Sequence, residues 1–578
     1  MRLLRVYPGF LVLLLAALNC AAQVHIREVG LQGYVGYSGP QRLRVEMSNP
    51  SARAETYVLR VTGSYQRSQN YHADHEIRLN AGETRTFDLP VLTGTRNKLK
   101  VEQVNAGGLS VSSDEGDIST EASGLIAVVC AAPSVCKAIS DAVRFGRSVE
   151  EQNAKERELK IVSITEPPQS WFAWEPARTV IIGGPIDNSS ARDALENYAR
   201  FGGDVIVVSD VAPRDFLAAY RTDDTRKVPI GNGTLRFVNT SSGQQLREMF
   251  QPEKTQRTGE GSFTVRFMIG GSQLMQWTGT RFVFPRLSWL IFWMVFYTVV
   301  VGVINFFVLR RIGKVELGWL TVPGIAILFA VLFYSISMRG KMTHFALDEA
   351  TVCFMDDKSS IGVAEHHFRV ASPQVRDVVL AVPANAVISS PGRDPLFRAS
   401  DAANLWNDDN ENRQGELSDI LVDAKQQHVP LEMLRFSFRD LEFRSVQQLA
   451  GTVRIKDGVL RNDTGQNFPQ SALIDFRSGV FYDLGPLPNG GNVRTGGKPE
   501  QRLSQRMFPF RDRHQAPVKP EFKLAEFLTS EPFTSPSPRN TLTFVGFTEQ
   551  PLVTGRLEGI SPQNRVSTLF LVTLERPK

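Results

Sequence analysis

Two cysteines, Cys130 and Cys136, have the chemistry and the spacing to act together. They are close enough in the chain to be bridged across the intervening turn, and an oxidising exported compartment would permit a disulfide. Spacing alone does not establish the geometry of such a bond. Two small buried residues near the end of a strand are therefore the alternative interpretation.

A cysteine nucleophile needs a neighbouring base, because the thiolate must form and the leaving group must be protonated. The chain has no histidine between His75 and His344, so Cys130 has no candidate base in its own region. We therefore predict that the protein is not an enzyme and has no catalytic residue. The sequence also has no pair of cysteines at zinc-ligand spacing, and we predict neither a metal nor a cofactor.

Three polar segments could in principle hold a metal ion. YHADHE at 71–76 and AEHHF at 364–368 combine imidazole with carboxylates, which suit divalent transition metals. Neighbouring residues of a strand point to opposite faces, so His366 and His367 would not converge, and we predict surface or strand-edge histidines. The segment 408–419 spaces its oxygens somewhat like a calcium loop, but Arg413 stands where the turn needs glycine, which favours a solvated polar loop.

The first 22 residues have the layout of a secretory signal peptide. Two arginines precede an apolar run, and small residues follow up to Ala22, after which we predict cleavage. Cys20 suggests a lipoprotein, but Leu18 and Asn19 fit the small-residue lipidation motif poorly. The chain is therefore expected to be exported.

Two further apolar runs, 287–309 and 317–338, are free of charge and long enough to cross a bilayer as helices. The connecting turn 310–316 carries three basic residues, Arg310, Arg311 and Lys314, which predict a cytoplasmic location for it. With an exported N-terminus, both large portions of the chain then lie on the exported, periplasmic or extracellular, side of a bacterial cytoplasmic membrane. A buried hairpin in the core of a soluble protein is the alternative.

Small and polar residues within the two runs are predicted to pack helices. They are Gly302, Asn305, Gly318 and Gly324, which could bring the two spans together or against a partner. Neither run contains a carboxylate, so nothing in them supports a conducting or proton-relay role.

The exported portions predict three folded domains of a multidomain α+β membrane protein. Alternating short strands over 23–118 indicate an immunoglobulin-like β-sandwich, and strands alternating with helices over 119–280 indicate an α/β domain. Gly202 and Gly203 should end one of its helices in a left-handed cap. The portion 339–578 is predicted to be a second, β-rich domain.

A loose echo links the two β-rich portions. "MSNPSA" leading to "LNAGETRTFDLP" near the N-terminus is followed much later by "LRNDTG" leading to "LGPLPNGG". The echo indicates either two related sandwiches or two β-domains that use common turns.

Two stretches carry a resemblance to known families. "PPQSWFAWEPARTVIIGG" and "ALENYARFGGDVIVVSD" resemble class I glutamine amidotransferase-like domains over roughly 123–210, which implies a flavodoxin-like α/β fold. Where such enzymes place the nucleophile elbow, this chain has Gly183, Gly184 and Pro185, so the resemblance implies a catalytically degenerate domain. "YTVVVGVINFFVLRRIGKVELGWLTVPGIAIL" is similar to the hairpin of uncharacterised bacterial two-span envelope proteins, which implies the same order of domains.

The chain carries a formal net charge of only +5 over 578 residues without a basic block, which disfavours nucleic acid as a partner. We therefore predict a non-enzymatic cell-envelope membrane protein that contacts the lipid bilayer and binds an unknown ligand or other envelope proteins. A subunit of a membrane export, assembly or transport complex is the alternative, and a cryptic hydrolase is a weaker one.

Overall fold

The computed structural model describes the chain in eighteen segments: 24–36, 39–65, 69–92, 97–104, 110–118, 125–130, 132–147, 160–209, 212, 215–221, 227–238, 271–280, 287–339, 342–390, 417–495, 500–503, 522–530 and 541–576. The predicted signal peptide, Cys20 and most of the polar loop 408–419 lie outside these residues. Within them the protein is a strand-rich α+β molecule with several sheets and two apolar helices, which agrees with the predicted fold class at this coarse level.

The N-terminal unit consists of two antiparallel sheets around a common core. The first contains β1 (Val24–Val29), β2 (Pro40–Ser48) and β5 (Thr84–Leu92), in the order β1-β2-β5. The second contains β3 (Glu55–Tyr65), β4 (Gln69–Leu79), β6 (Asn97–Val104) and β7 (Ser110–Ile118), in the order β4-β3-β6-β7. Leu43, Val45 and Met47, predicted to share one face of a strand, are all fully buried in that core.

The α/β unit follows with a six-stranded sheet. Its strands are β8 (Leu125–Val129), β9 (Ile161–Ile164), β10 (Ala177–Ile182), β11 (Asp204–Val208), β12 (Val228–Ile230) and β13 (Gly233–Val238), in the order β12-β13-β11-β10-β8-β9. All are parallel except the edge strand β12. The parallel strands therefore have the doubly wound order 2-1-3-4-5, numbered along the chain from β8.

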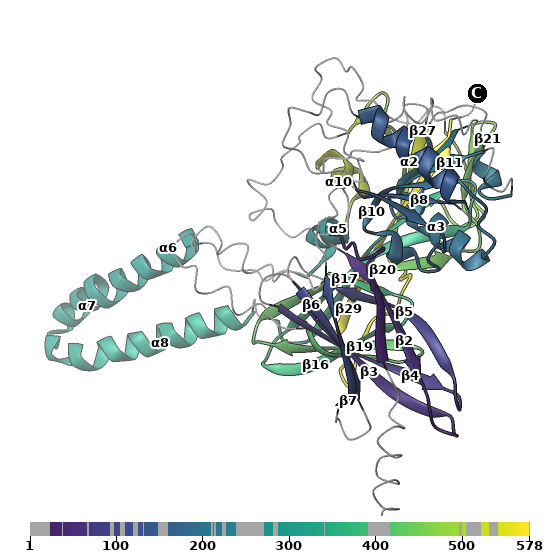
Figure 1. Cartoon of the computed structure of the whole chain (residues 1–578). Helices are drawn as coiled ribbons and strands as arrows, with labels where there is room; N and C mark the ends of the chain where they lie inside the picture. Colours follow the sequence, from purple (N-terminus) through teal and green to yellow (C-terminus); the bar gives the residue numbers. More distant parts are fainter. Residues whose placement is uncertain are drawn as a thin grey trace, which may run out of the picture.

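Helices cover both faces of this sheet, as the alternation of strand and helix predicted (Figure 1). Side chains of α2 (Pro133–Arg147) share a core with one face, and those of α3 (Ser189–Arg200) share a core with the other. Two short 3₁₀ turns, η2 (Trp171–Trp174) and η3 (Ala218–Tyr220), complete the unit.

The predicted left-handed cap after α3 is confirmed. Gly202 has φ +115°, its N–H donates to the Ala199 carbonyl, and the N–H of Gly203 donates to the Tyr198 carbonyl. Gly203 is needed for a different reason, since a Cβ there would lie 2.2 Å from the Tyr198 ring.

The helical hairpin projects away from the strand-rich body (Figure 1). After α5 (Gly271–Thr278) come α6 (Leu287–Thr298), the π-helical η4 (Val299–Ile304), α7 (Asn305–Ile312), the 3₁₀ turn η5 (Val315–Leu317) and α8 (Gly318–Arg339). Two helices, Ile291–Ile312 and Val315–Ser335, are long and apolar enough to cross a membrane, and only 0% and 6% of their apolar windows is buried. That exposure does not fit the buried-core alternative.

The turn of the hairpin is shorter than the predicted 310–316. The first helix continues to Ile312 because Gly313, at φ +73°, caps it, with the N–H of Lys314 bonded to the Leu309 carbonyl. Arg310 and Arg311 therefore lie in the last helical turn, where positive charge favours the carbonyl end of a helix.

The strands after the hairpin belong to two further units. They form a middle unit of β14 (Ala346–Asp356), β15 (Ile361–Ser372), β16 (Arg376–Pro383), β17 (Val387–Ser390), β18 (Leu417–Val422), β19 (Gln426–Met433), β20 (Ser437–Gln448) and β28 (Arg556–Leu557). The C-terminal unit contains β21 (Val453–Lys456), β22 (Val459–Asn462), β23 (Gln470–Asp475), β24 (Val480–Asp483), β25 (Asn492–Arg494), β26 (Glu500–Arg502), α10 (Leu524–Ser530), β27 (Thr541–Thr548) and β29 (Gln563–Glu575).

Sheets run across the boundaries between these units. The eight-stranded sheet β28-β16-β19-β18-β4-β3-β6-β7 joins strands from both sides of the hairpin, because β18 pairs in parallel with β4. Ile420 lies opposite Ala73 and Val422 lies opposite His75 in that pairing. The nine-stranded sheet β17-β20-β15-β14-β29-β27-β23-β24-β26 likewise joins the middle and C-terminal units through the parallel pair β14 and β29.

A buried asparagine closes the loop after β2. The Asn49 side-chain amide donates to the carbonyls of Arg53, Leu79 and Asn80 at 2.8, 3.3 and 2.9 Å. Its side-chain oxygen accepts from the N–H of Ser51. One residue therefore satisfies backbone groups from two loops that are distant in sequence.

Asn462, at the end of β22, makes the same set of contacts. Its side-chain amide donates to the carbonyls of Gln466, Leu487 and Pro488 at 2.8, 3.3 and 3.2 Å. Its oxygen accepts from the N–H of Thr464. The offsets along the chain, two and four residues onward and then a consecutive pair of carbonyls, match those around Asn49.

Strand order matches as well. The small sheet β21-β22-β25 corresponds to β1-β2-β5, and the run β24-β23-β27-β29 corresponds to β4-β3-β6-β7. Of the two interpretations of the sequence echo, these correspondences favour two related units over a chance use of common turns.

We expect Asn49→Ala and Asn462→Ala to lower the free energy of unfolding, each by at least about 2 kcal/mol, because buried carbonyls lose their donors. Thermal unfolding of the purified chain in detergent measures this as a lower melting temperature. Asn80→Ala is the control, since it removes an exposed side chain and keeps the carbonyl that Asn49 bonds. Equal melting of Asn462→Ala and Asn80→Ala would contradict the role of the buried amide.

Candidate functional site

The structure joins Cys130 and Cys136 as a disulfide with a Cα–Cα distance of 5.7 Å. Cys130 directly follows β8 and Cys136 lies in the first turn of α2, so the bond ties the strand to its helix. Both residues are buried, at 2% and 5% exposure. In this state Cys130 offers no thiolate.

The disulfide lies at the position where doubly wound sheets usually bind ligands, between the carboxyl ends of the first and third strands, here β8 and β10. The chain closes that crevice. The N–H of Gly183, after β10, donates to the Val129 carbonyl, and a Cβ on Gly183 would lie 2.3 Å from Cδ1 of Ile139 on α2. Glycine at 183 therefore lets helix and strand meet where related architectures leave an opening.

We expect the Cys130→Ala/Cys136→Ala double variant to lose about 2 kcal/mol of stability, the loop-closure value for so short a loop. Denaturant unfolding without reductant measures the loss, and addition of reductant to the unaltered chain should reproduce it. Alkylation of the denatured, unreduced chain should modify the free and buried Cys353 but neither Cys130 nor Cys136. Modification of all three would contradict the bond.

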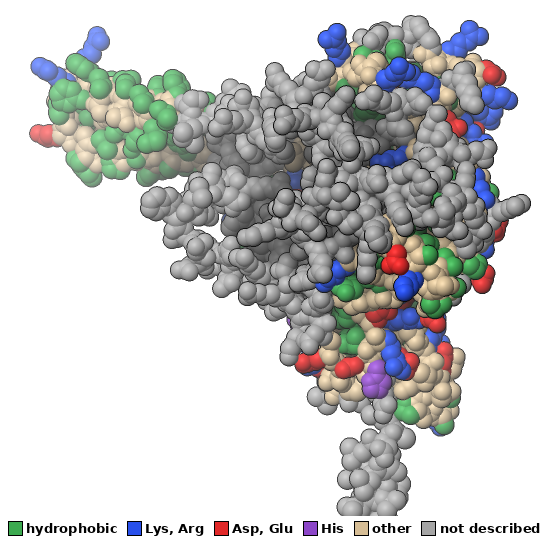
Figure 2. All heavy atoms as spheres, turned by 45° about the horizontal axis from the view of Figure 1, so that its top comes forward, with side chains coloured by type: hydrophobic (Ala, Val, Ile, Leu, Met, Phe, Trp, Pro, Cys, Tyr) green, Lys and Arg blue, Asp and Glu red, His purple; other side chains and the backbone are tan. Residues whose placement is uncertain are grey.

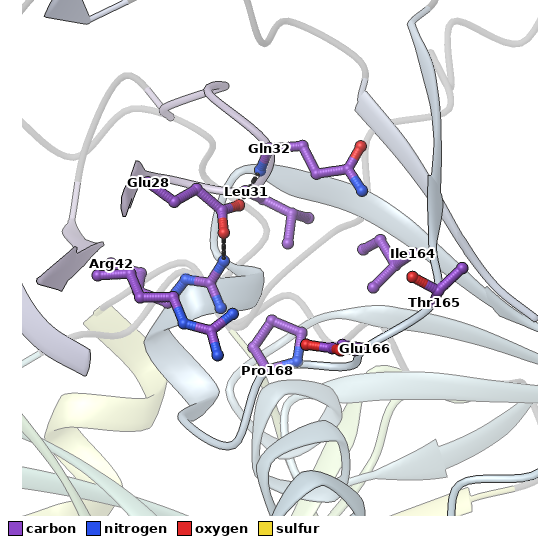
Figure 3. A pocket seen from close by; sticks show the side chains of 9 residues that line it. Glu28, Leu31, Gln32, Arg42, Ile164, Thr165, Glu166 and Pro168 are labelled. Atoms are coloured by element: carbon purple, nitrogen blue, oxygen red, sulfur yellow. Dashed lines mark hydrogen bonds and ion pairs between the residues drawn. The ribbon is translucent and has the colours of Figure 1, made fainter. Parts of the chain in front are cut away.

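A polar pocket of about 130 Å³ lies at the seam between the N-terminal unit and the α/β unit. Its lining comes from two places, as Figure 3 shows: Glu28, Leu31, Gln32 and Arg42 from the N-terminal unit, and Ile164, Thr165, Glu166 and Pro168 from the end of β9 and the loop that follows. Arg44 of the N-terminal unit also lines the pocket. Charged and polar side chains dominate this lining.

Arg42 is the most buried charged group of the pocket, at 3% exposure. Its Nη2 lies 2.5 Å from Glu28 Oε2, while Nη1 is 3.9 Å from Asp88, and Nε has no hydrogen-bond partner among the described residues. Arg44 lies 3.9 Å from the same Asp88. Burial raises the pKa of Asp88 despite the two arginines, so it is a weak counter-ion for them.

Gln32 links the two sides of the pocket. Its backbone has φ +50°, an uncommon value for a residue with a side chain, and its N–H donates to Glu28. Its side-chain amide donates to the Ser163 carbonyl at 2.7 Å, across the seam. Such strained residues cluster at ligand sites, and the lining offers both donors and acceptors to a small polar molecule.

The sequence analysis did not identify this pocket. Its signal is weak: Arg42 and Arg44 alternate with the core residues Leu43 and Val45, which places the arginines on the outer face of β2. What covers that face is the α/β unit, and no local pattern in the chain encodes that contact.

His366 and His367 lie on opposite faces of β15, as alternation predicted, but the prediction of surface or strand-edge histidines was wrong. The two residues are only 1% and 4% exposed, because β15 lies inside the sheet between β14 and β20. His366 is buried in a chain of hydrogen bonds: its Nε2 lies 2.7 Å from the Ser445 hydroxyl, and its Nδ1 lies 2.9 Å from the Thr351 hydroxyl, which donates to Glu349. The order resembles a serine–histidine–carboxylate set, but Ser445 and Thr351 are fully buried and Glu349 is 5% exposed. The arrangement therefore satisfies polar groups inside the sheet and offers no entry for a substrate.

His367 faces a cluster of charges on the other side of the sheet. Asp440 and Glu442 each approach one of its ring nitrogens at 3.4 Å, and Arg369 binds Asp440 with two bonds of 2.8 Å. Burial opposes the charged form of His367, yet the two carboxylates outweigh it and raise its pKa. Burial alone would raise the pKa of Asp440, but Arg369 and His367 hold it at about 2.

The N-terminal histidine segment is also structural. Asp74 pairs with Arg60 through two bonds of 2.8 and 2.7 Å, and His72 lies 3.1 Å from the Thr62 hydroxyl. His75 is 6% exposed, and burial lowers its pKa to about 4. Across the described residues no three His, Cys, Asp or Glu side chains are grouped to hold a metal ion.

His75 should destabilise the fold in acid. Its folded pKa of about 4 is below the unfolded value of 6.5, so its contribution is present above pH 6.5 and is lost as the pH falls towards and through 4. That shift is worth up to roughly 3 kcal/mol. We expect His75→Leu to flatten the loss of thermal stability over this range, while His344→Leu, at an exposed histidine, keeps the slope of the unaltered chain. If the thermal stability of His75→Leu fell with pH as steeply as that of the unaltered chain, the contribution attributed to His75 would be refuted.

The residues predicted to set topology and to pack helices lie along the hairpin. Figure 2 shows hydrophobic side chains over its surface and Lys or Arg side chains at its free end, where Arg310, Arg311 and Lys314 are exposed. Asn305 begins α7, and Gly318 lies 3.7 Å from Leu309 by the position its Cβ would take. A Cβ at Gly302 or Gly324 would meet no atom within 4 Å, so these two glycines do not bring the two helices together.

Comparison with protein-family models and with curated proteins gives no match. Among solved structures, a Pseudomonas fluorescens alkylpurine DNA glycosylase is similar over 19% of this chain and 33% of its own, with 14% identity and a TM-score of 0.15. A Bacillus subtilis sporulation control protein is similar over 22% of this chain and 55% of its own, with 11% identity and a TM-score of 0.12. A Paenibacillus cycloisomaltooligosaccharide glucanotransferase is similar over 32% of this chain and 28% of its own chain, with 8% identity and a TM-score of 0.15. Similarity this low carries no argument about function.

Proposed function

We propose that the protein is a non-enzymatic cell-envelope component: a body on the exported side of the membrane, held by the helical hairpin, that binds a ligand or a partner protein. The resemblance to two-span envelope proteins and to a degenerate amidotransferase-like domain remains part of this proposal. Separate observations support its three parts, which are the same-side topology, the direction of insertion and the binding role.

The pairing of β4 with β18 carries the proposal. The two strands belong to portions of the chain on either side of the hairpin, and their backbones are bonded in one sheet. Hydrogen-bonded neighbours in a sheet lie about 4.8 Å apart, whereas a bilayer core is about 30 Å thick. The pairing therefore supports a topology in which both portions lie on the same side of the membrane that the hairpin enters.

The direction of insertion rests on charge and on the predicted export signal. Arg310, Arg311 and Lys314 lie at the far end of the hairpin, and positive charge favours the cytoplasmic side. The exposure of both helices supports lipid or other membrane helices as their surroundings. A turn of a few residues is then the part that reaches the cytoplasm.

The proposed binding role rests on two features: the polar pocket at the seam, and the closed crevice of the α/β unit. The crevice at the ends of β8 and β10 is closed by Ile139 and by the Cys130–Cys136 bond, which speaks against thiol catalysis there. The pocket beside Arg42 offers a guanidinium, carboxylates and amide groups instead. Such a lining suits recognition of a small polar group.

A subunit of a membrane complex is the second candidate. The open faces at Gly302 and Gly324 favour it, since small residues let a neighbouring helix approach closely. Co-purification from mild detergent separates the two: a stoichiometric multi-span partner supports the complex, and an isolated protein supports the receptor-like role.

Same-side topology is tested with single cysteines at three exposed positions, Glu76→Cys, Lys425→Cys and Lys314→Cys, in bacterial cells with a permeabilised outer membrane. We expect a membrane-impermeant maleimide to label positions 76 and 425 equally, because both lie on the exported body. Position 314 should react only after the inner membrane is disrupted. Labelling of 76 without 425, or of 314 in intact cells, would overturn the arrangement.

A further inference from the structure

Among the described residues of the body, Val375 and Leu434 have the most exposed large apolar side chains, and they are far apart in the sequence. Val375 is 71% exposed and Leu434 is 63% exposed, whereas most apolar residues of the surrounding strands are buried. Val375 directly precedes β16 and Leu434 directly follows β19. Since Arg376 pairs with Met433 at that end, the two side chains stand in neighbouring turns.

These turns lie at the end of the middle unit where the chain arrives from the hairpin. Met342 is three positions after Arg339, the last residue of α8, a span of at most about 11 Å. Met342 packs against Ala346, Ala371 and Phe438. Ala371 ends β15 and Phe438 begins β20, the strands that border the two turns, and Ala346, at the start of β14, pairs with Ala371.

Both turns are held firmly. The Ser372 hydroxyl bonds the Gln374 carbonyl, and the Ser437 hydroxyl bonds the Leu434 carbonyl at 2.7 Å. Phe436 has φ +56°, an unfavourable value for an aromatic residue, and the Arg435 guanidinium lies 5.2 Å from its ring centre. The exposed side chains of Val375 and Leu434 are thus held in place by hydrogen-bonded turns.

The charges around the tips are mixed, with more positive ones closest to them. Arg376 and Arg435 adjoin Val375 and Leu434 directly, while Asp377 and Glu432 lie opposite each other one position further into the pair β16 and β19. Arginine beside an exposed apolar residue suits a membrane surface, because the chain stem stays in the apolar layer while the charge reaches the headgroups.

We propose that the turns 373–375 and 434–436 insert Val375 and Leu434 into the headgroup–acyl boundary of the bilayer, so that the body rests on the membrane at the root of the hairpin. The inference rests on the proposed membrane anchoring, because the occupant of this surface is identified by its continuity with α8. It goes beyond anchoring in fixing which end of the middle unit faces the lipid.

The test uses the full chain in vesicles of phosphatidylcholine and phosphatidylglycerol, with a spin label on single introduced cysteines. Val375→Cys and Leu434→Cys report on the turns. Lys425→Cys, exposed at the opposite end of β19 and roughly 30 Å away by strand rise, is the matched control. Ile327→Cys, 66% exposed on α8, reports on the hairpin itself. The unsubstituted chain gives the background from native thiols.

In these vesicles we expect labels at 375, 434 and 327 to collide several-fold less often with a water-soluble nickel chelate than the label at 425 does. They should gain collisions with oxygen, which concentrates in the bilayer. Labels at 375 and 434 that remain as water-exposed as 425, while 327 is in lipid, would overturn the insertion and leave the anchoring intact. A water-exposed label at 327 would overturn both.

Discussion

Hydrogen bonding between β4 and β18 is the constraint on which the rest of the architecture depends. Neither the N-terminal sheet nor the middle unit is complete without it, because Leu59 and Val61 share a core with Leu347 and Phe443 from beyond the hairpin. The N-terminal portion is synthesised first and leaves β4 as an open sheet edge until the later strands arrive. An open edge invites pairing with other chains, so the pairing of β18 with β4 also protects the N-terminal unit from such pairing.

The α/β unit is locked into the same body from the other side. Arg444 of β20 lies 3.0 Å from Glu175, and Tyr220 donates to the buried Asp356 at the end of β14 at 2.8 Å. Burial raises the pKa of Asp356, against the effect of nearby Arg200, so the charged form of this carboxyl is costly to bury at the contact. A doubly wound domain fixed in this way, with its crevice closed by Ile139, can still contribute one wall of a pocket. The seam beside Arg42 is where it does so.

What the sequence predicted was local, and what it did not predict was long-range. The buried face of β2, the Gly202 cap and the two apolar helices follow from periodicity and from glycine geometry within a few residues. The seam pocket and the β4–β18 register depend on which surfaces meet, and nothing near Arg42 or Val422 encodes the partner. The sequence echo around Asn49 and Asn462 lies between these two cases, because it was seen in the sequence but not resolved there. The turn residues were visible, but only the matched hydrogen bonds and strand order distinguish related units from common turns.

The described segments that precede and follow the hairpin in the chain are bonded to each other. Thr280, after α5, donates its N–H and its hydroxyl to the two oxygens of Asp348, at 2.5 and 3.0 Å, and Asp348 is a buried residue of β14. One carboxylate therefore ties together the segments that lead into and out of the hairpin. α5 also packs Leu274 and Met275 into the core that holds Val352 and Phe354. The nine-stranded sheet that contains β14 also contains β20, and Arg444 of β20 contacts Glu175 of the α/β unit. The segments on both sides of the hairpin and the α/β unit are therefore bonded to one and the same sheet.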